Sequence, residues 1–285
     1  HFNFRLGKMD AINRETKEIS LEPFFDLDGV QIIPRRHFAY DTLVIAVGST
    51  INDFNIKGAK EHAIALDTLQ QAERFHQKLH NAILRAQTQA DEITPGQLEV
   101  VIVGAGATGV ELAAELHKAT REMTAYGLDK INPDRDISIS LIEASDRLLP
   151  ALPPRMSQSV ESELRKLNVN LFMGERVTEV NAKGIMTHKD RYIDSALVVW
   201  AAGIKAPGFL QKLGLTTNVI NQIEVLSTLQ SIDDESIFAF GDCAACPEKP
   251  GAIKMVPPRA QSAHQQASML VKTIKKIVLG KGGIL

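Results

Sequence analysis

The sequence lacks the features that mark secreted, membrane-spanning and nucleic-acid-binding proteins. Its 285 residues include only two cysteines, Cys243 and Cys246. Two cysteines make no disulfide framework, so a reducing cytoplasmic setting is expected. No apolar run approaches the ~20 residues that cross a bilayer, and no signal-peptide pattern opens the sequence. The net charge of -2 argues against a broad nucleic-acid-binding surface.

The sequence also has few candidates for nucleophilic or metal chemistry. No Ser-His-Asp or Cys-His pattern of a nucleophilic enzyme is present. His76 and His80 have the spacing of a zinc-binding pair, but Gln77 stands where a metalloprotease needs glutamate, so a solvated helix face is expected. Cys243 and Cys246 have redox-motif spacing without a thioredoxin-like setting, and they could supply only half a zinc site. No metal site is predicted.

The most informative stretch is LEVVIVGAGATGVELAAEL, residues 98–116. A short apolar run of the kind that forms a buried parallel strand is followed at once by Gly104, Gly106 and Gly109, and then by a helical pattern. In that setting GxGxxG predicts a dinucleotide site. The first glycine permits the tight turn, the second lets a pyrophosphate approach, and the third lets helix and strand pack closely. The helix N-terminus would meet the phosphates.

A second strand is predicted over 137–142, and it ends at Glu143. An acid at this position accepts hydrogen bonds from the adenosine ribose, and its charge repels a 2′-phosphate, so Glu143 favours NADH over NADPH. Glu143 lies 37 residues after Gly106, whereas ~20 is usual. An extended helix and loop over 120–136 would account for the extra length.

Three other predicted strands also end in small or acidic residues. In a doubly wound sheet the ligand lies at the carboxyl ends of the strands, so these positions are candidate binding residues. A plain turn or an Asp helix cap is the alternative. The positions are Gly48 and Ser49 after strand 40–47, Ala202 and Gly203 after strand 197–200, and Gly241 and Asp242 after strand 237–240. Trp200 is the only tryptophan and is interpreted as a packing residue.

Further elements are assigned from periodicity and turn residues. Helices are predicted over 67–90, 108–126 and 157–167, the last with Ser157 as its cap. Strands are predicted at 2–6, 17–22 and 223–230, with a hairpin over 177–188.

A helix is also predicted from about Arg259. Gln261 and Gln265 lie four apart on one face of it, which suits a carbonyl ligand or a flavin edge, although two exposed glutamines would look the same. Lysines 272, 275 and 276 form a cationic amphipathic stretch, either a membrane-binding surface or a solvated face.

Taken together, VVIVGAGATGVELAAEL, LIEA, VVWAAGI and IFAFGDCA followed by PPRAQSAHQQ resemble type II NADH dehydrogenases. These are single-subunit NADH:quinone oxidoreductases of bacterial respiratory membranes. DCAACP and LLPALPPR are similar to the proteobacterial branch. The resemblance runs along essentially the whole chain and implies an FAD-dependent enzyme. Such an enzyme transfers hydride from NADH to flavin and then two electrons to a membrane quinone without pumping protons.

The resemblance also implies roles for individual residues. NADH would be bound by Gly104, Gly106, Gly109 and Glu143, with Ala202 and Gly203 beside the nicotinamide. FAD would be approached by Gly48, Ser49, Gly241 and Asp242, and Gln261 and Gln265 would lie near the quinone pocket. Glu111 matches an acid near the nicotinamide and flavin and is assigned to proton or quinone handling. A first-turn carboxylate favoured by the helix dipole is the alternative for Glu111.

The implied fold is an α/β, two-dinucleotide-binding-domain (Rossmann-like) flavoprotein fold with an incomplete FAD domain. Residues 1–57 and 223–285 would be two pieces of the FAD domain, and 58–222 the inserted NADH domain. A segment carrying the FAD pyrophosphate motif and a membrane-attaching C-terminal segment are expected outside the sequence, so that the chain is a fragment. The parent protein is expected at the cytoplasmic face of the inner membrane, peripheral, with a homodimer left open.

Two alternatives to this function are kept. One is another flavin-dependent disulfide or ferredoxin reductase, which AQxAxQQ argues against. The other is a non-catalytic NAD(H)-binding fragment.

Overall fold

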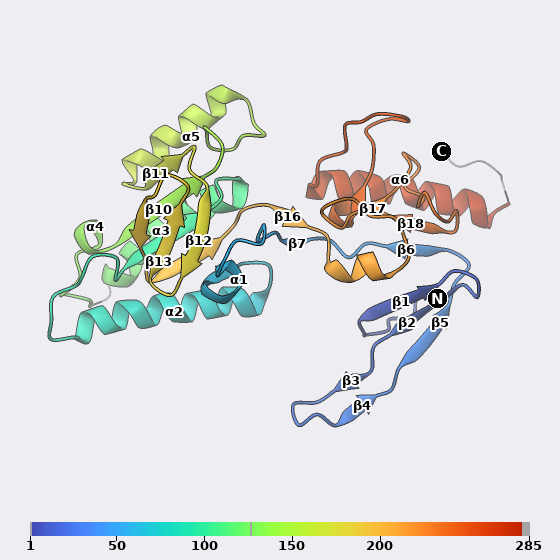
Figure 1. Cartoon of the computed structure of the whole chain (residues 1–285), viewed down its shortest axis with the longest axis horizontal. Helices are drawn as coiled ribbons and strands as arrows, with labels where there is room; N and C mark the ends of the chain where they lie inside the picture. The colour runs from blue at the N-terminus through green and yellow to red at the C-terminus, as the bar shows by residue number, and fades with distance from the viewer. Residues whose placement is uncertain (1, 126, 281–285) are drawn as a thin grey trace. The chain divides into compact units, whose positions relative to one another are not determined.

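The structure is a computed structural model that describes residues 2–125 and 127–280 (Figure 1). The chain divides into two compact units. One, which we call the inserted unit, is Ile51–Gly203, and the other, the terminal unit, joins His1–Thr50 to Ile204–Leu285. The inserted unit therefore starts seven residues before the expected boundary at residue 58, and it ends 19 residues before the expected boundary at residue 222.

The packing explains these two boundaries. Ile51 and Ile56 pack against the apolar cluster that contains Val177 and Trp200, all within the inserted unit. After the second boundary, Ala206, Leu210, Leu213 and Leu215 belong to the core of the terminal unit.

The inserted unit is built on a five-stranded parallel sheet with the order β11-β10-β9-β15-β8. Its central strands are almost wholly apolar and buried, as expected of a sheet covered on both faces. This sheet confirms the Rossmann-like α/β prediction. The strands are β8 (Ala63–Ala65), β9 (Glu99–Val103), β10 (Ser138–Glu143), β11 (Asn170–Met173) and β15 (Leu197–Trp200).

The longest helix of this unit, α2, begins with a capping box. The Thr68 side chain accepts from the backbone of Gln71, whose own side chain reaches back to the cap. Phe75, Leu79 and Ile83 then recur at helical spacing and are buried. The helices of the unit are α1 (Ala59–His62), α2 (Leu69–Thr88), α3 (Ala107–Ala125), α4 (Pro133–Asp136) and α5 (Pro154–Lys166).

Helix α5 begins three residues earlier than predicted, so Ser157 is not its cap. Pro154 occupies the first turn, where its fixed φ and missing N–H cost nothing. Ser157 is instead a buried helical residue whose hydroxyl accepts a hydrogen bond from Arg147 at 3.3 Å.

The predicted hairpin over 177–188 is confirmed as β12 (Val177–Asn181) and β13 (Gly184–Thr187), which pair antiparallel. A strand that the sequence did not indicate, β14 (Tyr192–Asp194), extends it to three strands.

In the terminal unit, two parallel strand pairs and one long helix form the core. The parallel pairs are β6 (Leu43–Ile45) with β18 (Ile237–Ala239), and β17 (Ile223–Glu224) with β19 (Ala244–Ala245), and the long helix is α6 (Ala260–Val278). The unit also contains an antiparallel sheet of β1 (Met9–Asn13), β2 (Glu18–Leu21) and β5 (Arg36–Ala39), the pair β3 (Phe24–Phe25) and β4 (Gln31–Ile33), and the 3-10 turns η1 (Gly208–Lys212) and η2 (Gly241–Cys243). The chain crosses between the units at β7 (Thr50–Ile51) and β16 (Ile204–Lys205).

Two strand predictions in this unit are wrong. Residues 2–6 alternate in sequence but form no strand, because Phe2, Phe4 and Leu6 are all exposed and no neighbouring strand pairs with them. The strand predicted over 223–230 is only β17, since the chain turns at Leu229, which has a φ of 69°. Among the described residues, no helix combines the length and apolarity needed to cross a bilayer.

Candidate functional site

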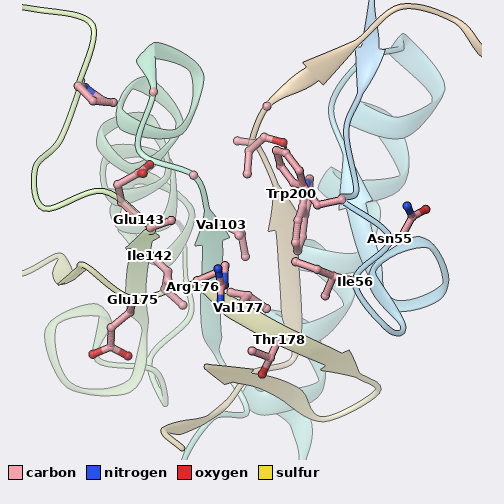
Figure 2. Close-up of a pocket in the computed structure, with 18 of the residues that line it drawn as sticks. Asn55, Ile56, Val103, Ile142, Glu143, Glu175, Arg176, Val177, Thr178 and Trp200 are labelled. Carbon is pink, nitrogen blue, oxygen red and sulfur yellow. The ribbon is translucent and has the colours of Figure 1, made fainter. Parts of the chain in front are cut away.

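A pocket of about 910 Å³ opens in the inserted unit at the carboxyl ends of β9, β10 and β15 (Figure 2). This edge is where open parallel sheets bind their ligands. The pocket combines an apolar lining with a few polar groups, as ligand sites do. Its apolar lining includes Ile56, Val103, Ile142, Val177 and Trp200.

The glycine loop after β9 has a distinct steric reason for each glycine. Gly104 has a φ of 104°, and a Cβ there would lie 2.7 Å from the Cα of Ala202. A Cβ on Gly109 would lie 1.9 Å from the Gly104 carbonyl oxygen, so only glycine lets α3 approach the loop this closely. Gly106 lines the pocket, and nothing lies within 4 Å of the position of its missing Cβ. The open side of Gly106 leaves room for a ligand at the backbone.

Glu143 is fixed at the edge of this pocket by the backbone. Its Oε2 accepts from the amide of Ala105 at 2.8 Å, and its Oε1 accepts from the amide of Ser145 at 2.7 Å. Each carboxylate oxygen keeps accepting capacity after one such bond. The arrangement therefore ties the acid to the glycine loop and still allows it to accept from ligand hydroxyls.

Trp200, at the end of β15, forms one wall of the pocket (Figure 2). Ala202 and Gly203, which follow β15, also line it. The Trp200 indole is only 3% exposed, and its Nε1 donates to the carbonyls of Asn52 at 2.9 Å and Ala202 at 3.2 Å. Gly203 has a φ of 63°, and a Cβ there would contact the ring of Phe54 at 2.6 Å. A buried, hydrogen-bonded indole forms a rigid wall for the pocket.

Glu111 is not brought to this pocket. It is exposed on α3 and is not one of the residues that line the cavity. Because α3 starts at Ala107, Glu111 also lies beyond the first turn, where the helix dipole favours a carboxylate most.

The terminal unit brings together two other predicted sites. Strands β6 and β18 are parallel neighbours, so the residues that follow them meet at one edge. There the Ser49 hydroxyl donates to Asp242 Oδ2 at 2.9 Å. Gly48 and Gly241 both have positive φ, at 67° and 73°, and no atom lies within 4 Å of a Cβ built on Gly48. The site therefore offers a carboxylate beside open backbone, which suits a ligand carrying sugar or polyol hydroxyls.

Gln261 and Gln265 lie exposed on α6 in the same unit. The adjacent Gln266 was not predicted, yet it is the glutamine that contacts the site. Its half-buried Oε1 accepts from the amide of Gly241 at 2.8 Å. The sequence signal was the third glutamine of AQSAHQQ, which lies off the face shared by the other two.

The two cysteines are packing residues in the terminal unit. Both are free and buried, and the Cys243 thiol contacts the carbonyls of Phe240 at 3.3 Å and Ile45 at 3.5 Å. Burial raises the pKa of both thiols above their usual range, which disfavours the reactive thiolate. No cluster of three metal-ligating side chains occurs within residues 2–125 and 127–280.

The chain resembles known proteins over nearly all of its length. It is 41% identical to a type II NADH:quinone oxidoreductase of Haemophilus influenzae over 96% of this chain and 64% of that protein. The chain thus spans less than two thirds of the length of this relative.

Among solved structures, one of NDH2 from Plasmodium falciparum in complex with NADH has a TM-score of 0.80 at 22% identity, covering 94% of this chain and 68% of that one. The structure of an FAD-dependent pyridine nucleotide-disulphide oxidoreductase from Desulfovibrio vulgaris has a TM-score of 0.62 at 27% identity, and the match covers 93% of this chain and 60% of that one.

The family assignment comes from a model that covers most of the chain. The model described as pyridine nucleotide-disulphide oxidoreductase matches residues 5–267. The chain therefore belongs to the pyridine nucleotide-disulphide oxidoreductase family.

Proposed function

We propose that this chain is the nucleotide-binding part of an FAD-dependent type II NADH:quinone oxidoreductase. The position of Glu143 supports this function most directly, because the Ala105 amide holds its carboxylate at the edge of the glycine-loop pocket. The 41% identity to the Haemophilus influenzae enzyme supports the same activity.

NADH would bind in the pocket of the inserted unit. Its pyrophosphate would lie beside Gly106 and the N-terminus of α3, where backbone amides and the helix dipole favour negative charge. Glu143 would accept from the adenosine ribose, and its charge would disfavour a 2′-phosphate. Ala202 and Gly203 would contact the nicotinamide end, where small residues leave space.

FAD would bind in the terminal unit, and the residues there fit it. Asp242, oriented by Ser49, can accept from a ribityl hydroxyl, while Gly48 and Gly241 leave the backbone accessible. When bound, the flavin supplies the chemistry that takes hydride from NADH and passes two electrons to a quinone. Gln261 and Gln265 would contact the quinone through amides that donate and accept. The role of Glu111 in proton handling stays a prediction.

A peripheral membrane location at the cytoplasmic face fits a quinone substrate. Helix α6 contains no acidic residue and ends with Lys272, Lys275 and Lys276 beside exposed Val271 and Val278. A cationic amphipathic surface of this kind binds anionic lipid headgroups. Replacing the three lysines with glutamine should weaken sedimentation with anionic vesicles and leave the weak binding to neutral vesicles unchanged. A homodimer stays a prediction, for light scattering to test.

The absorbance spectrum of the purified chain tests the proposed function. Bound flavin with NADH-driven reduction of a soluble quinone supports the enzyme, and preference for a disulfide or ferredoxin would favour the alternative reductases. A colourless protein that still binds NADH would restrict this chain to nucleotide binding. A chain that binds neither flavin nor NADH would contradict the proposal.

A further inference from the structure

Among the described residues, Arg176 is a cation of the proposed nucleotide pocket that no acidic side chain neutralises. Of the other charged lining residues, Lys57 pairs with Glu179 at 3.1 Å, and Glu143 is bonded to backbone amides. Arg176 also lines the pocket and is exposed. Within the described residues its guanidinium has neither an ion-pair partner nor a hydrogen-bond acceptor.

Glu175, the residue before Arg176, has its charge neutralised within the protein. Glu175 is 4% exposed and is held by Arg191 at 3.1 Å and by the hydroxyl of Thr187 at 3.1 Å. In Figure 2 the side chain of Glu175 is directed away from the middle of the pocket, while that of Arg176 extends into it. The protein thus satisfies the acid internally and leaves the neighbouring guanidinium for a ligand.

The backbone holds Arg176 beside the strand end that carries Glu143. The amide of Glu175 donates to the Glu143 carbonyl at 2.9 Å, and the amide of Gly174 donates to the Ser145 carbonyl at 2.7 Å. Nevertheless the Arg176 and Glu143 side chains form no ion pair. The two opposite charges therefore face one pocket with space between them (Figure 2).

The group that would occupy this space is the adenosine ribose, because Glu143 is the proposed acceptor for its hydroxyls. NADH and NADPH differ only at the 2′ position of this ribose, where NADPH carries a phosphate. A guanidinium binds phosphate oxygens through two parallel N–H donors, and an arginine near this position accommodates the 2′-phosphate in other dinucleotide folds.

We propose that Arg176 binds the 2′-phosphate of NADPH, so that the pocket accepts NADPH as well as NADH despite the charge of Glu143. The inference rests on the proposed nucleotide site and extends its substrate class. Glu143 sets the preference for NADH, and Arg176 limits how strong that preference becomes.

Trp200 provides a direct binding assay that needs no flavin. It is the only tryptophan, it lines the pocket, and its emission overlaps the absorption of reduced nicotinamide, so binding should quench its fluorescence. Arg176→Gln should raise the dissociation constant for NADPH about 10-fold to 100-fold, the effect of losing a charge-assisted hydrogen bond. The constant for NADH should change less than about 3-fold. Lys57→Gln, a matched cation already paired with Glu179, should leave the ratio of the two constants unchanged.

A second pair of variants isolates the charge effect. Glu143→Gln should lower the dissociation constant for NADPH, and adding Arg176→Gln to this variant should raise the constant again. Equal weakening of NADH and NADPH by Arg176→Gln would place the guanidinium on a shared part of the nucleotide and overturn the inference, as would an unchanged NADPH constant. If NADH fails to quench Trp200 in the unaltered protein, the proposed nucleotide site is wrong and this inference falls with it.

Discussion

Ser49 and Asp242 are separated by 193 positions in the chain and joined by a hydrogen bond of 2.9 Å. The bond exists because β6 and β18 run parallel and end at the same level. It orients the Asp242 carboxylate of the proposed flavin site.

Asp242→Asn should lower flavin retention, because the amide loses the charge that strengthens acceptance from a flavin hydroxyl. Ser49→Ala should have a smaller effect, since it removes only the orienting hydroxyl. The flavin-to-protein absorbance ratio after gel filtration measures both changes. Equal retention in Asp242→Asn and the unaltered protein would remove Asp242 from the flavin site.

Gln265 and Gln266 are adjacent on α6 and should give different phenotypes. Gln265→Ala should impair quinone reduction more than NADH-to-flavin transfer, because we propose that its exposed amide contacts the quinone. Gln266→Ala removes the acceptor of the Gly241 amide and should lower flavin retention instead. Stopped-flow kinetics of the two half-reactions separates these effects, and identical profiles for the two variants would refute the division of roles.

Gly109 and Gly106 form a second matched pair. Gly109→Ala would place a Cβ 1.9 Å from the Gly104 carbonyl oxygen, so it should destabilise the inserted unit by about 2 kcal/mol or more. Gly106→Ala enters open space and should leave thermal unfolding unchanged. Its methyl group should nevertheless weaken NADH binding by obstructing the pyrophosphate. Normal NADH affinity in Gly106→Ala would place the pyrophosphate elsewhere.

The carboxyl of Glu99 should make the free energy of unfolding of the inserted unit depend on pH. Burial raises the pKa of this carboxyl, partly offset by the hydroxyls of Ser140 and Ser138, and its Oε1 has no hydrogen-bond partner among the described residues. The raised pKa means that the folded state favours the proton, so stability falls as pH rises through the folded-state pKa.

Glu99→Gln should therefore stabilise the inserted unit at pH 7 by about 1 kcal/mol, and the gain should disappear by about pH 3, below the ordinary pKa range of glutamate. Thermal unfolding at the two pH values measures this. A gain of the same size at both would mean that the charge is not its cause.

The sequence predicted the features that are encoded locally. The run from Val100 to Gly109 specifies strand, turn and helix through adjacent residues, and the structure has all three in that order. Ser157 misled the prediction because a serine cap and a proline first turn compete within three residues, and Pro154 prevailed. The alternation at 2–6 failed because a strand also needs a partner.

Gln266 and Arg176 were missed for a different reason. Neither residue lies in a local sequence pattern that indicates a role. Gln266 is identified by the Gly241 amide, 25 residues away in sequence. The role proposed for Arg176 depends on pairing in the folded chain, where Glu175 and Lys57 have partners and the Arg176 guanidinium has none among the described residues. Long-range pairing of this kind cannot be read from spacing.

We propose that the inserted unit binds NADH with Glu143 at the adenosine ribose. The most direct test is to titrate the unaltered protein and Glu143→Arg with NADH and NADPH, following Trp200 fluorescence. Glu143→Arg should raise the dissociation constant for NADH about 10-fold or more and lower that for NADPH, because a carboxylate that accepts from the ribose is replaced by a guanidinium that donates hydrogen bonds to the 2′-phosphate. An unchanged ratio of the two constants would contradict the assignment of Glu143 and, with it, the proposed NADH site.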